Sequence, residues 1–427
     1  MRYIFTAAIL VLTVLFARAQ RTDKIINPRA VKKIERVLSS DKMEGRALYS
    51  PGLDKTAAFI AAQFAKTGME PLKGNSSFFQ EFSMIDAKQI AASGTIGENT
   101  IPGQNIIGFT SKQHLQIDNS AGFTSVTIGA GEKFLYTAYR YLQEGKNYIV
   151  WVDTAQASNF SMLDRLKGPR FKSDNSVIFV LSPSSPAFSF VIDSEVSEKK
   201  LKNVTGMIPG KSRADEFVIF SGHYDHLGIG KPDDLGDSIY NGANDDAAGI
   251  TAVIMLARYF SKWHNNERTL VFAAFTAEES GGFGSQYFSQ QLDPAKVIAM
   301  FNIEMIGTES KWGKNSAYIT GYEKTDMGAI LGKNLQGTGF TFHPDPYPDQ
   351  QLFYRSDNET LRRLGVPAHT ISTSKMDNEP FYHTPADEIN TLDMKNMAEI
   401  IKAIVLSSRT IISGEDTPTR VDAQKLR

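Results

Sequence analysis

Histidines and carboxylates recur in this chain directly after strand-like segments or at the start of a helix. Imidazole and carboxylate groups bind divalent metal ions, and carboxylates also act as general bases. The chain of 427 residues contains no cysteine, so any metal ion must be held by His, Asp and Glu alone. The candidate residues are His223 and Asp225, Asp245, the adjacent pair Glu278 and Glu279, Glu304, and Tyr382 with His383.

The elements that must position these residues begin at about residue 201. Strand-like and helix-like segments alternate from there to the C-terminal helix. This alternation predicts an α/β fold with a central mixed, largely parallel twisted sheet and helices on both faces. Strands are expected over 216–223, 268–276, 296–307 and 366–373, and helices over 247–260, 282–291, 325–335, 356–365 and 392–411. Because functional groups gather at the carboxyl ends of parallel strands, the candidates are expected to converge.

A site for two divalent metal ions accounts for such a convergence. Two ions about 3.5–4 Å apart repel each other, so a bridging carboxylate helps to hold both. Each ion needs further carboxylate or imidazole ligands and an open position for water. Without thiolate ligands, such a site suits two zinc ions, with manganese or cobalt as substitutes.

Five motifs carry a resemblance to a known family. H-x-D, G-A-x-D-D-x-x-G, A-E-E, N-x-[DE]-M and Y-H-T-P resemble those of metallopeptidase family 28, the di-zinc aminopeptidases and carboxypeptidases related to glutamate carboxypeptidase. The likeness covers roughly residues 40–80 and 200–412. It implies a zinc-exopeptidase-like fold and an aminopeptidase that removes N-terminal residues from peptides. The side-chain preference and the alternatives of carboxypeptidase or dipeptidase action stay open.

The resemblance also implies a metal ligand set. Asp245 would bridge the two ions through a cis peptide bond to Asp246. The family usually has Asp where this chain has Glu304, which keeps the charge and adds one methylene group. The first ion would be held by His223 and Glu304, and the second by Glu279 and His383.

Catalytic roles follow from the same resemblance. Glu278 would face the metal-activated bridging water as general base and then move its proton, so the adjacent glutamates would differ in role. Asp225 would orient the metal ligand His223 without binding a metal ion itself. Tyr382 would donate a hydrogen bond to the tetrahedral oxyanion, although a structural tyrosine is an equal alternative. His226 is expected to be a wall residue rather than a third metal histidine.

A segment rich in Pro and Tyr, residues 343–358, is the candidate substrate wall. The resemblance places Tyr354, Arg355, Ser356 and Asp357 near the substrate, and a plain packed loop is the alternative.

The chain is expected to divide into five parts. Residues 1–19 are typical of a signal peptide, with a charged start, an apolar stretch and a small-residue cleavage site, which predicts export to the periplasm or the medium. That apolar stretch is shorter than the ~20 residues of a membrane span. The other expected parts are 20–84, the N-terminal helical part of the peptidase domain; 85–200, a β-rich inserted segment; 201–415, the catalytic domain; and 416–427, a C-terminal tail.

The composition argues against some functions, and details of the motifs help to choose between the remaining ones. A formal net charge of −1 argues against a nucleic-acid partner, and no later stretch is long and apolar enough to cross a membrane. The family resemblance implies a peptide substrate as the partner. The oligomeric state is not predicted.

A glutaminyl cyclase with a single zinc ion is the alternative enzyme, but such enzymes usually carry a tryptophan-containing insertion after the E-E pair. A non-catalytic binding module on the same fold is the third possibility, although such relatives have lost metal ligands.

Overall fold

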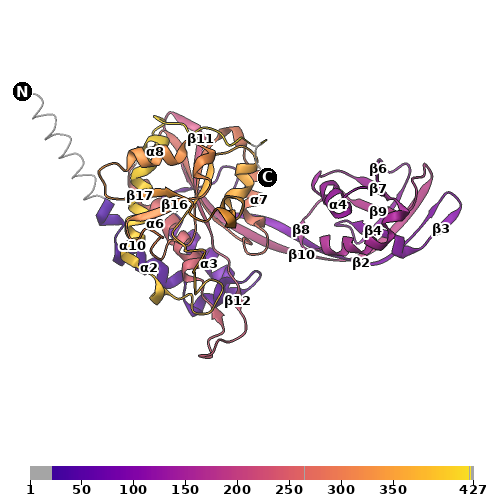
Figure 1. The fold of residues 1–427 in the computed structure, drawn as a ribbon, viewed down its shortest axis with the longest axis horizontal. Helices are drawn as coiled ribbons and strands as arrows, with labels where there is room; N and C mark the ends of the chain where they lie inside the picture. The colour runs from indigo at the N-terminus through magenta and orange to yellow at the C-terminus, as the bar shows by residue number, and fades with distance from the viewer. Residues whose placement is uncertain (1–21, 264, 423, 425–427) are drawn as a thin grey trace, which may run out of the picture. The chain divides into compact units, whose positions relative to one another are not determined.

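The structure, a computed structural model, divides into two compact units. It describes residues 22–263, 265–422 and 424, so the expected signal peptide lies outside the described residues. The main unit comprises the described residues up to Glu81 and from Lys202 onward, and the inserted unit comprises Phe82–Leu201. Figure 1 labels the elements of both units. None of the helices in the described ranges has both the length and the hydrophobicity needed to cross a bilayer.

A mixed sheet forms the centre of the main unit. Its four middle strands, β14 (Arg268–Phe275), β11 (Arg213–His223), β15 (Val297–Ile303) and β18 (Ala368–Ser372), run parallel to one another. Antiparallel pairs join β10 to β14 and β16 to β18 at the flanks. The strand order is β17 (Thr341–Pro344), β16 (Ser316–Ile319), β18 (Ala368–Ser372), β15 (Val297–Ile303), β11 (Arg213–His223), β14 (Arg268–Phe275) and β10 (Phe188–Ile208). The expected largely parallel sheet is confirmed.

Helices cover both faces of this sheet because its strands alternate apolar side chains between the faces. Phe220 of β11 stacks on Phe260 of α6 at 5.5 Å between ring centroids. The preceding Ile219 belongs to a buried cluster on the opposite face with Phe288 and Leu361. The first face carries α6 (Ala248–Trp263), against which α2 (Pro28–Leu38), α3 (Pro51–Ala65) and α10 (Met394–Ser407) pack, and the second carries α7 (Phe283–Gln290) and α9 (Asn358–Arg363).

The expected elements from 201 onward are all present, but the short strands β16 and β17 of the central sheet were not predicted. β16 and β17 are only four residues long each. Segment 343–358 therefore begins inside β17 and continues through two short 3-10 turns, Pro348–Gln350 and Leu352–Tyr354. The remaining elements of the main unit are β1 (Glu70–Pro71), β12 (Gly228–Ile229), β13 (Ile239–Tyr240), α8 (Met327–Asn334) and α11 (Arg409–Ile412).

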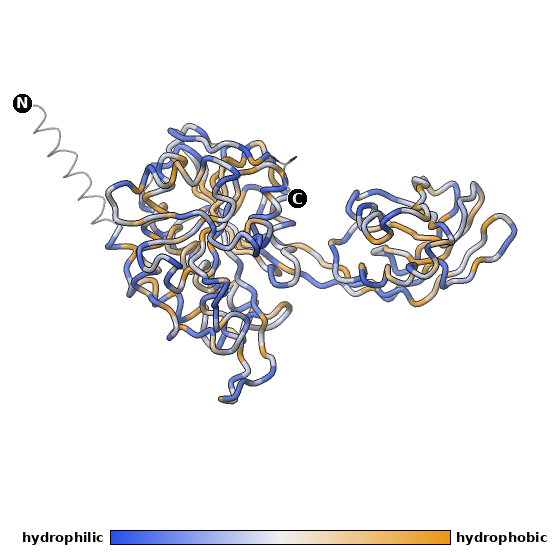
Figure 2. Tube along the Cα trace, in the orientation of Figure 1, coloured by the Kyte–Doolittle hydropathy of each residue, from blue (hydrophilic) through white to orange (hydrophobic). Residues whose placement is uncertain are grey.

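The inserted unit has its own sheet and its own cores. Val150 and Val152 of β7 pack in a cluster with Ala138 of the helix α4 (Phe134–Gln143). The alternate residue Trp151 packs on the other face against Phe190. Figure 2 shows hydrophobic segments inside each unit. The sheet order is β4 (Ile106–Phe109), β9 (Val177–Leu181), β7 (Tyr148–Val152) and β6 (Thr124–Ile128); further elements are β2 (Phe79–Ile96), β3 (Asn99–Ile101), β5 (His114–Asp118), β8 (Arg170–Phe171) and α5 (Ala157–Phe160).

Candidate active site

Four of the candidate residues lie at or just beyond the carboxyl ends of three adjacent parallel strands, whereas Asp245 precedes helix α6 and His383 lies in a turn. His223 is the last residue of β11, and Glu304 directly follows β15. Glu278 and Glu279 lie in the turn after β14. The turns are sharp, because the non-glycine residues Ala277, Met305 and His383 adopt left-handed φ values of 59°, 52° and 56°. Backbone strain of this kind concentrates at functional sites, and here it adjoins the ligand candidates.

Asp246 ties three of these segments together. Its buried carboxylate accepts backbone N–H groups of His223 at 3.2 Å, Gly249 at 3.0 Å and Met305 at 3.1 Å. A Cβ atom at Gly249 would lie 2.4 Å from this carboxylate and 2.1 Å from the carbonyl oxygen of Ile303. Only glycine therefore allows the helix start to approach so closely. The peptide bond between Asp245 and Asp246 is cis, as the resemblance implied.

Asp387 fixes the segment of the expected bridging residue. Its carboxylate accepts the backbone N–H of Asn244 at 2.8 Å and of Asp245 at 3.0 Å. It follows His383 by four positions in the motif Y-H-T-P-A-D. The two ligand-bearing segments are therefore held together by a side chain that does not itself enter the ligand cluster.

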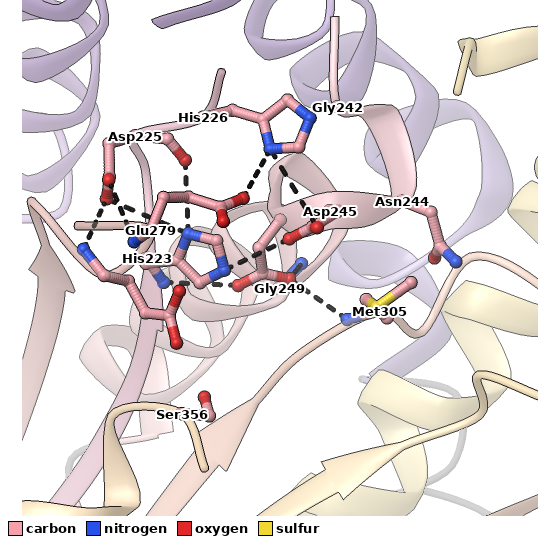
Figure 3. A network of polar contacts seen from close by, with 12 residues as sticks. His223, Asp225, His226, Gly242, Asn244, Asp245, Gly249, Glu279, Met305 and Ser356 are labelled. Atoms are coloured by element: carbon pink, nitrogen blue, oxygen red, sulfur yellow. Dashed lines mark hydrogen bonds and ion pairs between the residues drawn. The ribbon is translucent and has the colours of Figure 1, made fainter. Parts of the chain in front are cut away.

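Candidate ligand atoms gather in two groups that share Asp245. In each group one ligand atom per residue lies within 4.8 Å of the others. Oδ1 of Asp245 lies 3.2 Å from Nε2 of His223, whereas Oδ2 lies 3.3 Å from Nε2 of His383. The two groups are His223, Asp245 and Glu304, and His226, Asp245, Glu279 and His383. Figure 3 shows His223, His226, Asp245 and Glu279 from these groups.

The chemistry of this cluster fits divalent metal ions. The Nε2 atoms of His223 and His383, which face Asp245, are buried and make no hydrogen bond with other described residues. Burial alone would raise the pKa of Asp245, but the contacts with His223 and His383 hold it far below its usual value. Contacts with Asp245 and Glu279 raise the pKa of His383 to about 10. In the metal-free chain a proton on His383 thus offsets the acidic charge, and metal binding would displace that proton.

The adjacent glutamates have different surroundings. Oε1 of Glu279 lies 2.8 Å from Nδ1 of His226, and Oε2 lies 3.2 Å from Nε2 of His383. These two contacts outweigh burial and lower the pKa of Glu279 to about 2. The carboxylate of Glu278 makes no hydrogen bond or ion pair with other described residues, and burial raises its pKa well above the usual range. Glu278 is therefore the one that is suited to take up a proton.

His226 lies beside the candidate metal ligands. It was expected to be a wall residue, and the structure brings its Nδ1 into the ligand cluster. The ring packs tightly over Gly242, where a Cβ atom would lie 2.5 Å from Cδ2 of His226. The signal in the sequence was the spacing H-Y-D-H, which places a second histidine three residues after His223.

Asp225 and Tyr382 lie next to the cluster. The carboxylate of Asp225 accepts the backbone N–H groups of Glu278 at 3.1 Å and Glu279 at 3.4 Å. Its Oδ1 is 3.8 Å from Nδ1 of His223, which is closer, at 3.2 Å, to the backbone carbonyl oxygen of Asp225. Tyr382 is half-buried, stacks on the His383 ring at 3.9 Å between centroids, and lines the pocket beside Glu278.

The four candidate substrate residues separate into two pairs. Arg355 and Ser356 line the pocket that contains Glu278 and Glu304. Tyr354 lies outside the pocket lining and stacks under the guanidinium group of Arg362 at 4.3 Å. Asp357 is also outside the lining and is fully buried.

Arg46, which the sequence analysis did not single out, connects the N-terminal part of the chain to the site. Its side chain is buried and donates hydrogen bonds to the carbonyl oxygens of Tyr224 and Gly242, both at 2.9 Å, and of Asp245 at 3.3 Å. These acceptors lie in the two segments that carry His223 and Asp245. One rigid guanidinium group therefore fixes the spacing between both segments.

If the cluster holds divalent metal ions, Arg46→Lys is expected to weaken their binding, tested with zinc, by about 10–100-fold, the usual effect of losing a group that orients ligands. Lysine keeps the charge but cannot reach acceptors on both segments with one planar group. Arg268→Lys is the matched control, because Arg268 is equally buried but donates to the carbonyl oxygens of Ile411 and Asp416. Zinc affinity is measured by competition with a chromophoric chelator, alongside thermal unfolding. Equal losses of zinc affinity in both variants would contradict a specific role for Arg46.

Comparison with known proteins identifies a family model and several relatives that the chain resembles. Residues 203–407 match the family model described as peptidase family M28. A probable leucine aminopeptidase of Arthroderma otae is 27% identical over 217 residues, covering 48% of this chain and 56% of that protein. A probable zinc metalloprotease of Pyrenophora teres f. teres is 35% identical over 109 residues, covering 25% of this chain and 23% of that protein. The chain thus spans from about a quarter to about half the length of these curated relatives.

Two solved structures share the fold across nearly the whole chain. The aminopeptidase from Aneurinibacillus sp. strain AM-1 superposes with a TM-score of 0.54 at 18% identity, covering 92% of this chain and 95% of that one. A zinc aminopeptidase from Bacillus subtilis gives a TM-score of 0.54 at 16% identity, covering 94% and 97%.

Proposed function

Residues 203–407 belong to peptidase family M28, and from this premise we propose that the chain is a zinc-dependent aminopeptidase that hydrolyses the N-terminal peptide bond of peptides. One observation carries the proposal: two groups of candidate ligand atoms share Asp245, and beside them lies the carboxylate of Glu278, which has no hydrogen-bond or ion-pair partner among the described residues. Two groups match two metal ions. A glutaminyl cyclase binds one zinc ion, which would not account for two groups of ligand atoms.

The proposed ligand set follows the two groups. His223 and Glu304 hold one zinc ion, Glu279 and His383 hold the other, and Asp245 belongs to both. His226 supports Glu279 through the contact of 2.8 Å at Oε1. When bound, the ions supply Lewis acidity to the substrate carbonyl and to the attacking water.

The residues of the chain then move protons and stabilise charge. Glu278 accepts a proton from the attacking water and passes it to the leaving amine, which its raised pKa favours. Asp225 fixes the turn that carries Glu278 by accepting its backbone N–H. Tyr382 keeps its hydroxyl proton, since burial raises its pKa, and can donate a hydrogen bond to the developing oxyanion.

The proposal is tested with matched peptides and product mass analysis. Zinc-loaded protein should remove the first residue of a peptide with a free amino terminus and leave the N-acetylated peptide intact. A chelator should abolish the reaction, and added zinc should restore it. Cleavage only at the carboxyl end would replace the aminopeptidase by a carboxypeptidase, and cyclisation of an N-terminal glutamine without hydrolysis would favour the cyclase.

Export and the five-part division of the chain also remain proposals. If 1–19 is a signal peptide, protein recovered from the native host should begin at Gln20, partly as pyroglutamate. Mass analysis of the N-terminal peptide reads this directly, and an intact Met1 terminus would contradict cleavage. Segments 20–84 and 201–415 would then form the mature peptidase domain, with 85–200 as the inserted segment and 416–427 as the tail.

A further inference from the structure

The charge of the pocket beside Glu278 is unevenly distributed. Its lining includes four carboxylates, those of Asp245, Glu278, Glu279 and Glu304, and otherwise consists mostly of neutral side chains. Among the described residues of this lining, Arg355 is the only one with a positive charge. The pocket therefore presents a single cation close to its catalytic carboxylates.

Arg355 has no partner of its own. It is exposed, and its guanidinium group makes no hydrogen bond or ion pair with any residue in the described ranges. Two arginines on the nearby helix α9 behave differently, because Arg362 and Arg363 both pair with Glu359. The charge of Arg355 lies within the site, because its side chain lines the same pocket as Tyr382 and Glu278.

The backbone holds Arg355 at the pocket. Its N–H donates to the carbonyl oxygen of Leu352 at 3.2 Å, which closes the 3-10 turn Leu352–Tyr354. The next residue, Ser356, is anchored from the sheet, because Nδ2 of Asn302 donates to its Oγ at 2.9 Å. These contacts fix the backbone of Arg355 at the pocket, so its side chain starts from a defined position beside the site.

Charge balance indicates what this cation binds. Two divalent ions would neutralise the four carboxylates of the lining, so the loaded pocket would keep the positive charge of Arg355. A guanidinium group presents parallel N–H donors that match the two oxygens of a carboxylate. A substrate carboxylate would provide the partner that the described residues do not provide.

We propose that Arg355 binds a carboxylate of the substrate, so that the enzyme prefers peptides with a negative charge beside the scissile bond. This inference rests on the proposed peptidase function. The carboxylate can belong to an acidic side chain of the terminal residue or to the free carboxyl terminus of a dipeptide. Both sources have the same chemistry, and the experiment separates them.

Three peptides make the comparison. The first has an N-terminal glutamate and an amidated carboxyl end, the second replaces that glutamate by glutamine, and the third is a neutral dipeptide with a free carboxyl terminus. Arg355→Ala should lower kcat/KM by about tenfold to a hundredfold for a peptide whose carboxylate it binds, the range for a lost charge-assisted hydrogen bond. The glutamine peptide should change by less than about threefold. Loss on the first peptide identifies the side chain, and loss on the third identifies the carboxyl terminus.

Two further variants sharpen the result. Arg355→Glu should lower kcat/KM for the carboxylate-bearing peptide further than Arg355→Ala does. Arg363→Ala is the matched control, since Arg363 is also exposed but pairs with Glu359 and lies outside the pocket lining. It should leave all three peptides unaffected.

Binding is measured separately from catalysis. Calorimetry with zinc-loaded Glu278→Gln protein, with and without Arg355→Ala, gives the affinity for the same three peptides. Equal losses on all three peptides, or no loss on any, overturn the inference. Absence of hydrolysis by the unaltered protein, together with weaker binding of a carboxylate-bearing peptide in Arg355→Ala, rejects the proposed function and keeps the carboxylate site.

Discussion

Glu278→Gln is expected to lower turnover by at least about 10²–10⁴-fold, the usual contribution of a positioned general base, with KM little changed. Glutamine keeps the size of the side chain and removes the basic carboxylate. Glu278 contributes no ligand atom to either group of the cluster, so both metal ions should stay bound. Turnover and zinc content are measured on the same preparation.

The fold should tolerate this change well. The carboxylate of Glu278 makes no hydrogen bond with other described residues, and burial raises its pKa. Replacing a poorly solvated acid by a neutral amide therefore removes no partner, and the thermal midpoint should not fall. Loss of zinc in Glu278→Gln would assign this residue to the ligands instead. Full activity with both ions bound would remove it from the mechanism.

Metal content is expected to fall in steps across three ligand variants. Asp245 belongs to both groups of ligand atoms, so Asp245→Asn should weaken both ions and retain less than one zinc ion per chain. Glu304 and Glu279 each belong to one group, so Glu304→Ala and Glu279→Gln should each retain about one tightly bound ion. Most activity should be lost in all three.

The step pattern is read by elemental analysis after dialysis, with Glu278→Gln as the control that keeps both ions. Excess zinc should partly restore Glu279→Gln, because its amide still offers an oxygen at the same place, and should not restore Glu278→Gln. Two ions at unchanged affinity in Glu304→Ala would remove Glu304 from the ligand set. A ratio of one ion in the unaltered protein would favour the single-zinc alternative.

The sequence alone predicted the architecture that carries the site. Apolar strands alternate with helices from 201 onward, and this local pattern requires a layered fold with a largely parallel sheet. Since the ends of parallel strands share one edge, His223, Glu279 and Glu304 could be expected to meet. They do lie around Asp245, within the two groups of ligand atoms.

What supports the ligands was decided by tertiary contacts. Arg46 reaches carbonyl oxygens 178 and 199 positions away in the chain, and the carboxylate of Asp387 accepts an N–H 142 positions away. No local spacing encodes such pairs, because they depend on how separate elements pack. His226, which was expected to be a wall residue, lies among the candidate ligand atoms for the same reason. Its ring packs over Gly242 and contacts Glu279, which is 53 positions away in the chain.

The short strands β16 and β17 and the residues of segment 343–358 also depend on tertiary packing rather than on local sequence. β16 and β17 have four residues each, too few for a periodic signal, and become strands by pairing beside β18. Among four consecutive residues from 354 to 357, only the second and third line the pocket. The sequence determines which residues can bind metal ions and move protons, because residue type and the order of the elements along the chain can be read locally. The tertiary structure decides which of their neighbours hold them in place and which face the substrate, because these depend on the packing of distant segments.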